Sequence, residues 1–163
     1  MDINKLFELA SPILEKNDFG VGHTKRVFAI AQENFSVKKE QEELTFSAII
    51  LHDIGGATIK EQYAKGPQIA STLLKQLGLP DEFIKQVCEI VGTHHEHPEN
   101  PSEPFRILYD SDKIVMFTKE EFECYNSMKD FDWDKIVDLI YSDKGKQVAR
   151  GMLVQRRSEQ KSG

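Results

Sequence analysis

The sequence has little cysteine, proline or glycine: two, six and ten residues respectively in a chain of 163. So few glycines and prolines exclude a collagen-like or low-complexity chain. Cys88 and Cys124 do not form a CxxC pair, which argues against a disulfide framework or a cysteine zinc site, and we expect two buried free thiols. No apolar run approaches the roughly 20 residues of a membrane-spanning helix. Because Met1 to Lys5 lack the features of a signal peptide, we expect a cytoplasmic protein without membrane contact.

Basic residues are also fewer than acidic ones. Lysine and arginine total 21 against 27 aspartates and glutamates, which gives a formal net charge of -6. An acidic protein repels a polyanion, so we do not expect duplex nucleic acid as a partner. A small phosphorylated ligand is compatible with this charge, because one pocket can be locally positive. The length is typical of one domain that buries a core without covalent cross-links.

Apolar residues recur at helical spacing along the chain, and no segment alternates like a strand. The spacing predicts helices over 21–35, 40–54, 69–77, 80–94 and 102–114, a short helix after Asp132, and a last helix around 148–153. We expect Pro12 to split or kink the first helix, and Thr118 with Glu121 to form a capping box for another. The predicted fold is a single compact all-α bundle over 1–163, with C-terminal helices over 118–157 and a frayed end from Arg156.

Histidines and aspartates cluster in particular places of this helical pattern. The five histidines are His23, His52, His94, His95 and His97. Asp53 follows His52 at the end of a predicted buried helix, and Asp110 and Asp112 lie in an otherwise apolar helical run. A carboxylate in apolar surroundings is costly unless a charge or a metal neutralises it. Imidazole and carboxylate ligands together favour Mn, Fe, Co, Ni or Zn over Ca or Mg.

The ordered set of His23, the pair His52-Asp53, and Asp112 followed by Lys113 resembles the HD-domain superfamily of metal-dependent phosphohydrolases. The resemblance covers residues 19–117 and includes Gly66-Pro67, which we expect to open a helix. It implies that His23, His52, Asp53 and Asp112 bind the metal. In such enzymes the ion polarises a phosphate oxygen and activates a water molecule. Asp110 is an alternative to Asp112 as the last ligand, and Asp112 is favoured because a lysine follows it.

The resemblance also implies substrate contacts. Lys113 matches a position that contacts phosphate in some relatives, and His94 matches one that binds a second metal or touches the phosphate, so we expect Asp53 and His94 to be catalytic. Arg26, one turn after His23, is a candidate phosphate clamp. His95 is a further candidate for substrate binding, although a solvated loop position would account for it as well.

Two-metal relatives carry a histidine directly before the Gly-Pro pair, where this chain has Lys65. An ammonium group is a poor metal ligand but a reasonable phosphate partner, so we expect Lys65 to contact substrate. We therefore expect one divalent metal rather than two. The aromatic residues of the C-terminal part are expected to serve in the core or in oligomer contacts rather than to stack on a base; they are Phe117, Phe122, Tyr125, Phe131 and Trp133.

Together these residues predict a hydrolase that cleaves a phosphate ester or anhydride of a nucleotide or a similar small metabolite. A non-catalytic sensor that binds metal and nucleotide is the first alternative, because Lys65 replaces a possible ligand. A diiron oxygenase and a metal-free helical interaction module are the others. Metal identity, the preferred nucleotide and the oligomeric state are not encoded in any pattern we recognise.

Overall fold

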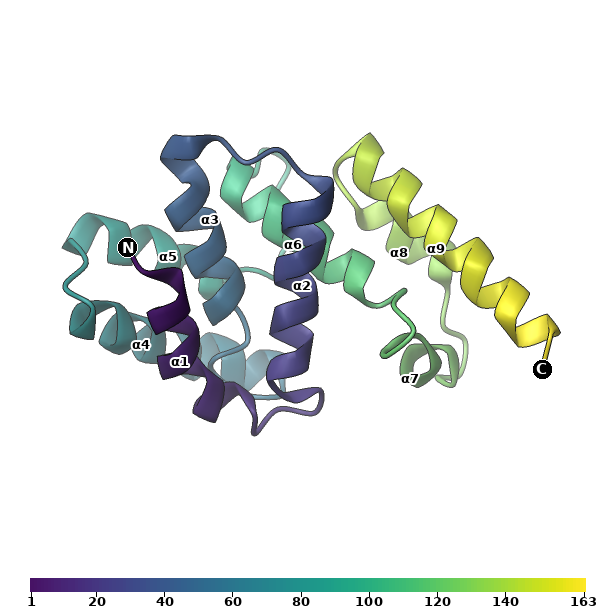
Figure 1. The fold of residues 1–163 in the computed structure, drawn as a ribbon, viewed down its shortest axis with the longest axis horizontal. Helices are drawn as coiled ribbons and strands as arrows, with labels where there is room; N and C mark the ends of the chain where they lie inside the picture. The colour runs from purple at the N-terminus through teal and green to yellow at the C-terminus, as the bar shows by residue number, and fades with distance from the viewer.

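The computed structural model describes all residues from 1 to 163 and contains nine helices and no strand (Figure 1). The helices are α1 (Ile3–Leu14), α2 (Gly20–Asn34), α3 (Lys39–Leu51), α4 (Ile59–Gln76), α5 (Asp81–Val91), α6 (Glu103–Val115), α7 (Phe122–Asn126), α8 (Trp133–Leu139) and α9 (Asp143–Lys161). The predicted all-α class is confirmed. None of these helices combines the length and the apolar character that crossing a membrane requires.

Helices α2, α3 and α6 form the middle of the molecule, where each contacts the other two (Figure 1). On one side, α4 packs against α5 and α1 packs against α3. On the other side, α9 packs against α6 and α8, and the short helix α7 lies below them in the figure. The N-terminus and the C-terminus therefore lie on opposite sides of the middle helices.

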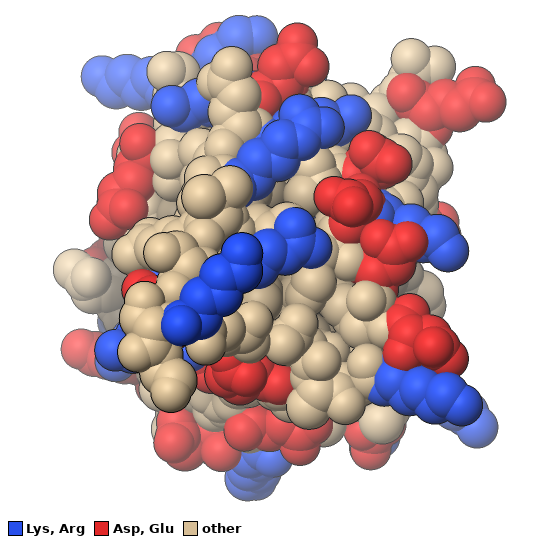
Figure 2. Space-filling model, turned by 90° about the vertical axis from the view of Figure 1, so that its right-hand side faces the viewer, with Lys and Arg blue, Asp and Glu red and all other residues tan.

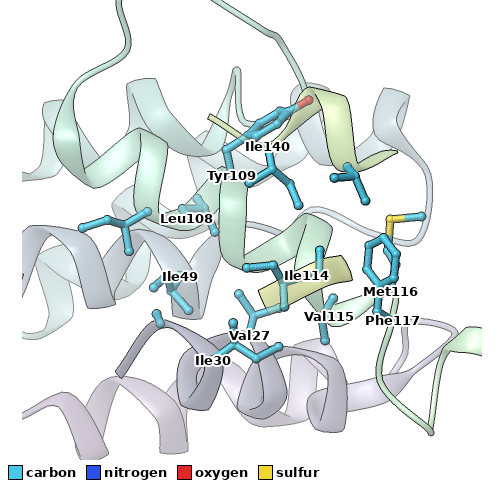
Figure 3. Packing of buried hydrophobic residues seen from close by; sticks show 14 of the residues in the cluster. Val27, Ile30, Ile49, Leu108, Tyr109, Ile114, Val115, Met116, Phe117 and Ile140 are labelled. Carbon is cyan, nitrogen blue, oxygen red and sulfur yellow. The ribbon is translucent and has the colours of Figure 1, made fainter. Parts of the chain in front are cut away.

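Two hydrophobic clusters stabilise the two sides. The larger has 21 buried residues and joins α2, α3 and α6 to the C-terminal helices; Figure 3 shows Ile114 and Val115 near Val27. The smaller has 12 buried residues and joins α1, α3, α4 and α5. Because α3 and α6 are enclosed on most sides, a polar group on either helix must find a partner inside the protein.

Helix α4 begins earlier than the sequence pattern predicts. Its N-terminus is a capping box in which Thr58 Oγ1 accepts a hydrogen bond from the Glu61 N–H (3.3 Å) and Glu61 Oε2 accepts one from the Thr58 N–H (3.3 Å). Gly66 and Pro67 lie inside the helix, so the prediction that they open it is wrong. The capping box was the signal that marks the true start.

Gly55 explains why α4 passes so close to the end of α3. A Cβ at Gly55 would lie 2.6 Å from the Gln62 Cα and 2.7 Å from the Gly66 nitrogen. Only a residue without a side chain fits between these backbone atoms. The turn after α3 therefore packs directly on the backbone of α4.

Several local predictions are wrong. Pro12 does not split the first helix, because α1 continues through it to Leu14, and α9 extends to Lys161 instead of fraying at Arg156. The Thr118 hydroxyl donates to the Val115 carbonyl (2.6 Å) and does not cap α7, and the Glu121 side chain turns into the core. Both cysteines are free, but Cys124 is exposed and Cys88 only half-buried.

The aromatic residues of the C-terminal part divide into two groups. Phe117, Phe122 and Trp133 are buried, with the Phe122 and Trp133 rings stacked at 4.5 Å between centroids. Tyr125 instead borders a cavity beside the histidines. The face of the molecule seen from its C-terminal side mixes lysine and arginine side chains with aspartate and glutamate side chains (Figure 2).

Candidate metal centre

The predicted ligands come from the ends of three central helices and from one turn. His23 lies in the first turn of α2, His52 caps the C-terminus of α3, and Asp53 follows it in the turn. Asp112 lies in the last turns of α6, one residue before Lys113. Neighbouring helical side chains point about 100° apart, so His52 and Asp53 reach one place only because α3 ends between them.

The four side chains converge on one point. His23 Nε2 lies 3.2 Å from His52 Nε2, 3.2 Å from Asp112 Oδ1 and 3.4 Å from Asp53 Oδ2. His52 Nε2 lies 3.3 Å from Asp53 Oδ2 and 3.5 Å from Asp112 Oδ1. All four side chains are buried or nearly so, with Asp53 the most exposed at 19%.

The opposite ring nitrogens explain which tautomer each imidazole adopts. The His52 Nδ1–H donates to the Ile49 carbonyl (2.7 Å), and the His23 Nδ1–H donates to Glu121 Oε1 (2.9 Å). These tautomers follow from the partners, because only a donor suits a carbonyl or a carboxylate. In neutral rings both Nε2 atoms are then acceptors, which face each other and two carboxylate oxygens. Such a set of buried acceptors fits a divalent cation.

The pKa values of these side chains also show that a positive charge is favoured at this point. Burial disfavours the charged form of His23, but hydrogen bonds to Asp112 and Glu121 outweigh it and raise its pKa to about 9. Burial likewise opposes charge on His52, yet the Asp53 carboxylate and Asp112 raise its pKa well above the usual value. Burial alone would raise the pKa values of Asp53 and Asp112, but the neighbouring histidines outweigh it and lower both. All of these shifts reflect how strongly the two carboxylates favour a positive charge between them.

His94 and His95 add a second group of donors beside the first. The His94 Nδ1–H donates to the Val91 carbonyl (2.7 Å), which leaves a buried Nε2 without a hydrogen-bond partner, 3.4 Å from Asp53 Oδ1. Asp53, His94 and His95 together place three ligand atoms within 4.8 Å of one another. The expectation of one metal rested on Lys65, and this triad supplies donors that the expectation did not count.

His95 is held by neighbours on α4. Its Nε2 lies 2.6 Å from Gln62 Oε1, and its backbone N–H donates to the Tyr63 hydroxyl (3.0 Å). Burial and the neighbouring His94 lower the pKa of His95 to about 4, so its ring is neutral near pH 7. His95 lines the cavity next to the centre, so it is not simply a solvated loop residue.

Asp110 serves a different purpose from Asp112. Its Oδ1 accepts from the Tyr141 N–H (2.7 Å), and its Oδ2 accepts from the N–H (3.0 Å) and hydroxyl (2.7 Å) of Ser142. Both oxygens are therefore occupied by the junction between α8 and α9. The structure places Asp112, and not Asp110, at the two histidines.

Glu121 is the buried residue that the sequence pattern did not reveal as part of the centre. Its side chain is fully buried, and Oε1 accepts both from His23 and from the Arg26 guanidinium (2.7 Å). Arg26 consequently points at Glu121 and does not border the cavity. No short spacing signals this contact, because Glu121 lies 98 residues after His23.

Beside the centre lies a cavity of about 280 Å³ bordered by sixteen residues, among them His23, Asp53 and Asp112. Lys113 also borders it; its Nζ lies 3.9 Å from Asp112 Oδ2 and 4.9 Å from the centre of the Tyr109 ring. Lys65 is 61% exposed, pairs with Glu61 and does not border the cavity.

Comparison with known proteins agrees with the geometry. The family model described as HD domain matches residues 20–116, which is 97 of the 163 residues and includes all four converging side chains. No curated protein and no solved structure is similar enough to count as a match. The chain belongs to the HD domain family, whose members are mostly metal-dependent hydrolases.

Proposed function

We propose that the protein is a metal-dependent phosphohydrolase that cleaves a phosphate ester or anhydride of a nucleotide or a similar small metabolite. The observation that carries this proposal is the convergence of four buried acceptors from His23, His52, Asp53 and Asp112 next to a cavity that also contains Lys113. Cation site, phosphate partner and space for a substrate thus occur together.

Those four side chains would hold a divalent transition metal. When bound there, such an ion supplies a Lewis acid for a phosphate oxygen and lowers the pKa of a water molecule from 15.7 to about 7. The four side chains fit a cation because their acceptor atoms face one another at this point. Glu121 keeps His23 in the tautomer that presents Nε2 to the centre.

Other residues bind the phosphate and move the proton. The Lys113 ammonium binds a phosphate oxygen from the cavity side, since it is largely shielded from solvent and has only a long contact to Asp112. His94 Nε2, with its lone pair free, accepts the proton of the attacking water. Asp53 contacts both histidine groups and orients the water between them.

The test combines metal analysis with a search for phosphate release. The purified protein is analysed for metal, and hydrolysis of a panel of phosphorylated metabolites is then measured with Mn, Co or Ni. We expect activity that falls by at least about 100-fold in His52→Ala and Asp53→Ala. His97→Ala is the matched control, because His97 is exposed and its Nε2 contacts the Leu139 carbonyl away from the centre. Unchanged activity in His52→Ala would contradict the proposal.

These measurements, together with a calorimetric titration of nucleotide binding, separate the alternatives. Tight nucleotide binding without product over hours would indicate a sensor module, in which the replacement of a ligand by Lys65 had ended catalysis. Two iron ions per chain would favour a diiron centre that uses Asp53, His94 and His95 as the second set of ligands.

A further inference from the structure

The cavity next to the metal centre is small. Its volume of about 280 Å³ lies just below the roughly 300–1,000 Å³ that ligand pockets occupy. Its walls come from the turn before α2, the turn between α3 and α4, and the region from the end of α6 to α7. A small substrate is the appropriate occupant.

Positive charge is scarce in this cavity. Lys113 is the one lysine or arginine that borders it, while the carboxylates are Asp18, Asp53 and Asp112. The Lys113 ammonium lies 3.9 Å from Asp112 Oδ2, so even this one positive charge is partly offset. A single phosphate group carries about -1.5 to -2 charges near neutral pH, and each further phosphate adds more. The carboxylates of Asp53 and Asp112 would offset most of the charge of a bound dication, so little positive charge is left for the substrate, and the cavity favours one phosphate group over several.

Free hydrogen-bond donors are scarce as well. The Asn17 amide donates to the Asp53 carbonyl (2.9 Å), and the Gln62 amide donates to the Gly56 carbonyl (3.1 Å). The Thr24 hydroxyl is buried and has no hydrogen-bond partner, so it is free to donate to a ligand in the cavity. Sites for polyphosphate chains use many donors along the chain, including a loop of backbone N–H groups. Among the side chains that border this cavity, the free donors are few: the Lys113 ammonium and the hydroxyls of Thr24 and Tyr125.

Part of the lining of the cavity is apolar and aromatic. Phe19, Met116 and Tyr125 all border it. The Phe19 and Tyr125 rings lie 6.3 Å apart and are tilted by 34°, and Phe19 also stacks on His23 at 6.2 Å. A flat or apolar group next to the phosphate would pack against these rings.

We propose that the substrate is a phosphate monoester with a single phosphate group, whose alcohol part carries an aromatic or apolar group. The proposal rests on the proposed phosphohydrolase function and narrows its substrate. Water attacks phosphorus, the bond from phosphorus to the ester oxygen breaks, and the ester oxygen leaves as the alcohol after taking up a proton. Alcohol and inorganic phosphate are the products, and water is the co-reactant.

Three matched probes test the two halves of the proposal. Adenosine monophosphate and adenosine triphosphate differ only in the number of phosphates, and ribose 5-phosphate lacks the base. With the metal-loaded protein we expect kcat/KM for the monophosphate to exceed that for the triphosphate by about tenfold or more. The base should add about 5- to 100-fold over ribose 5-phosphate through stacking. Calorimetric titration of each probe should give the same order of affinity.

Variants of Lys113 and Tyr125 test whether these residues cause the preference for a single phosphate and for a base. Lys113→Met should lower kcat/KM for the monophosphate by about 10- to 100-fold, because a charge-assisted hydrogen bond to the phosphate is lost. Lys85→Met, on the exposed side of α5, is the control and should be unchanged. Tyr125→Leu should reduce the advantage of adenosine monophosphate over ribose 5-phosphate several-fold, whereas Tyr125→Phe keeps the ring and the advantage.

The outcomes distinguish this proposal from the proposed function. A triphosphate hydrolysed as efficiently as the monophosphate, or equal kcat/KM for adenosine monophosphate and ribose 5-phosphate, would overturn the substrate class but leave a phosphohydrolase. No hydrolysis of any panel member by metal-loaded protein would overturn the function itself. Equal losses on both monoesters in Tyr125→Leu would show that the ring does not contact the base.

Discussion

At the scale of the residue, the centre depends on which nitrogen of each imidazole carries its hydrogen. His52 uses a backbone carbonyl of its own helix for this purpose, whereas His23 uses the carboxylate of Glu121. A carboxylate raises the basicity of the ring it binds, so the two ligands are not equivalent. Arg26 balances the charge of Glu121 in the core.

Replacement of Glu121 by glutamine tests this role. We expect Glu121→Gln to weaken metal affinity by about 10- to 100-fold, because the amide keeps the shape but loses the charge that holds His23. Competition with a chelator measures the affinity, and the absorption spectrum of the Co(II) protein reports the ligand geometry. Glu120→Gln, at the exposed neighbouring position, should match the wild type in both. A Glu121→Gln protein with unaltered affinity and spectrum would show that Glu121 is merely a core residue.

The two aspartates of α6 make a second comparison. We expect Asp110→Asn to lower the free energy of unfolding by about 1–3 kcal/mol, because the amide nitrogen cannot accept from the donors of Tyr141 or Ser142. Its metal affinity should stay close to that of the wild type. Asp112→Asn should instead weaken metal affinity strongly, since it removes a proposed ligand. Metal titration of both variants, with urea unfolding to measure the stability of each, checks the difference; similar metal affinities for the two would contradict it.

At the scale of the element, hydrophobic spacing located most helices but misplaced some of their ends. Caps decide where a helix starts, and the capping box of Thr58 and Glu61 was outweighed by the Gly66-Pro67 pair, which suggests a helix start. The opposite error occurred at Thr118, whose spacing to Glu121 fits a capping box. Glu121 is instead drawn into the core by His23 and Arg26, partners that no local pattern contains.

The close contact between α4 and the turn after α3 allows a prediction about Gly55. Gly55→Ala would place a methyl group 2.6–2.7 Å from backbone atoms of α4, so the helix must shift. We expect a loss of about 1–3 kcal/mol in the free energy of unfolding, typical of overpacking. Metal affinity should also fall, because the turn carries Asp53. Gly78→Ala tests a left-handed glycine with open space around it, so strain without overpacking should leave metal affinity intact. Wild-type stability and affinity in Gly55→Ala would refute the tight packing.

At the scale of the whole molecule, the centre is assembled by tertiary packing. The ordered histidines and aspartates indicated which residues to bring together, because a buried charge demands a partner. What spacing did not indicate was the contribution of the C-terminal part: Glu121 behind His23, Tyr125 at the cavity, and Asp110 tied to the start of α9. These contacts depend on how α6 sits between two clusters, which helical periodicity does not specify.

Because helices from both clusters meet at the centre, a bound ion should stabilise the whole fold. An ion present at about 1,000 times its Kd adds about 4 kcal/mol to the free energy of unfolding. For a chain of this length that corresponds to a rise in Tm of about 8–16 °C. Scanning calorimetry of protein stripped with a chelator and then reloaded with Mn, Co or Ni measures it. The rise should vanish in His52→Ala and persist in His97→Ala, because only His52 belongs to the converging set. If reloading is verified by metal analysis and Tm does not change, the ion binds elsewhere, and the four side chains are held together by protons alone.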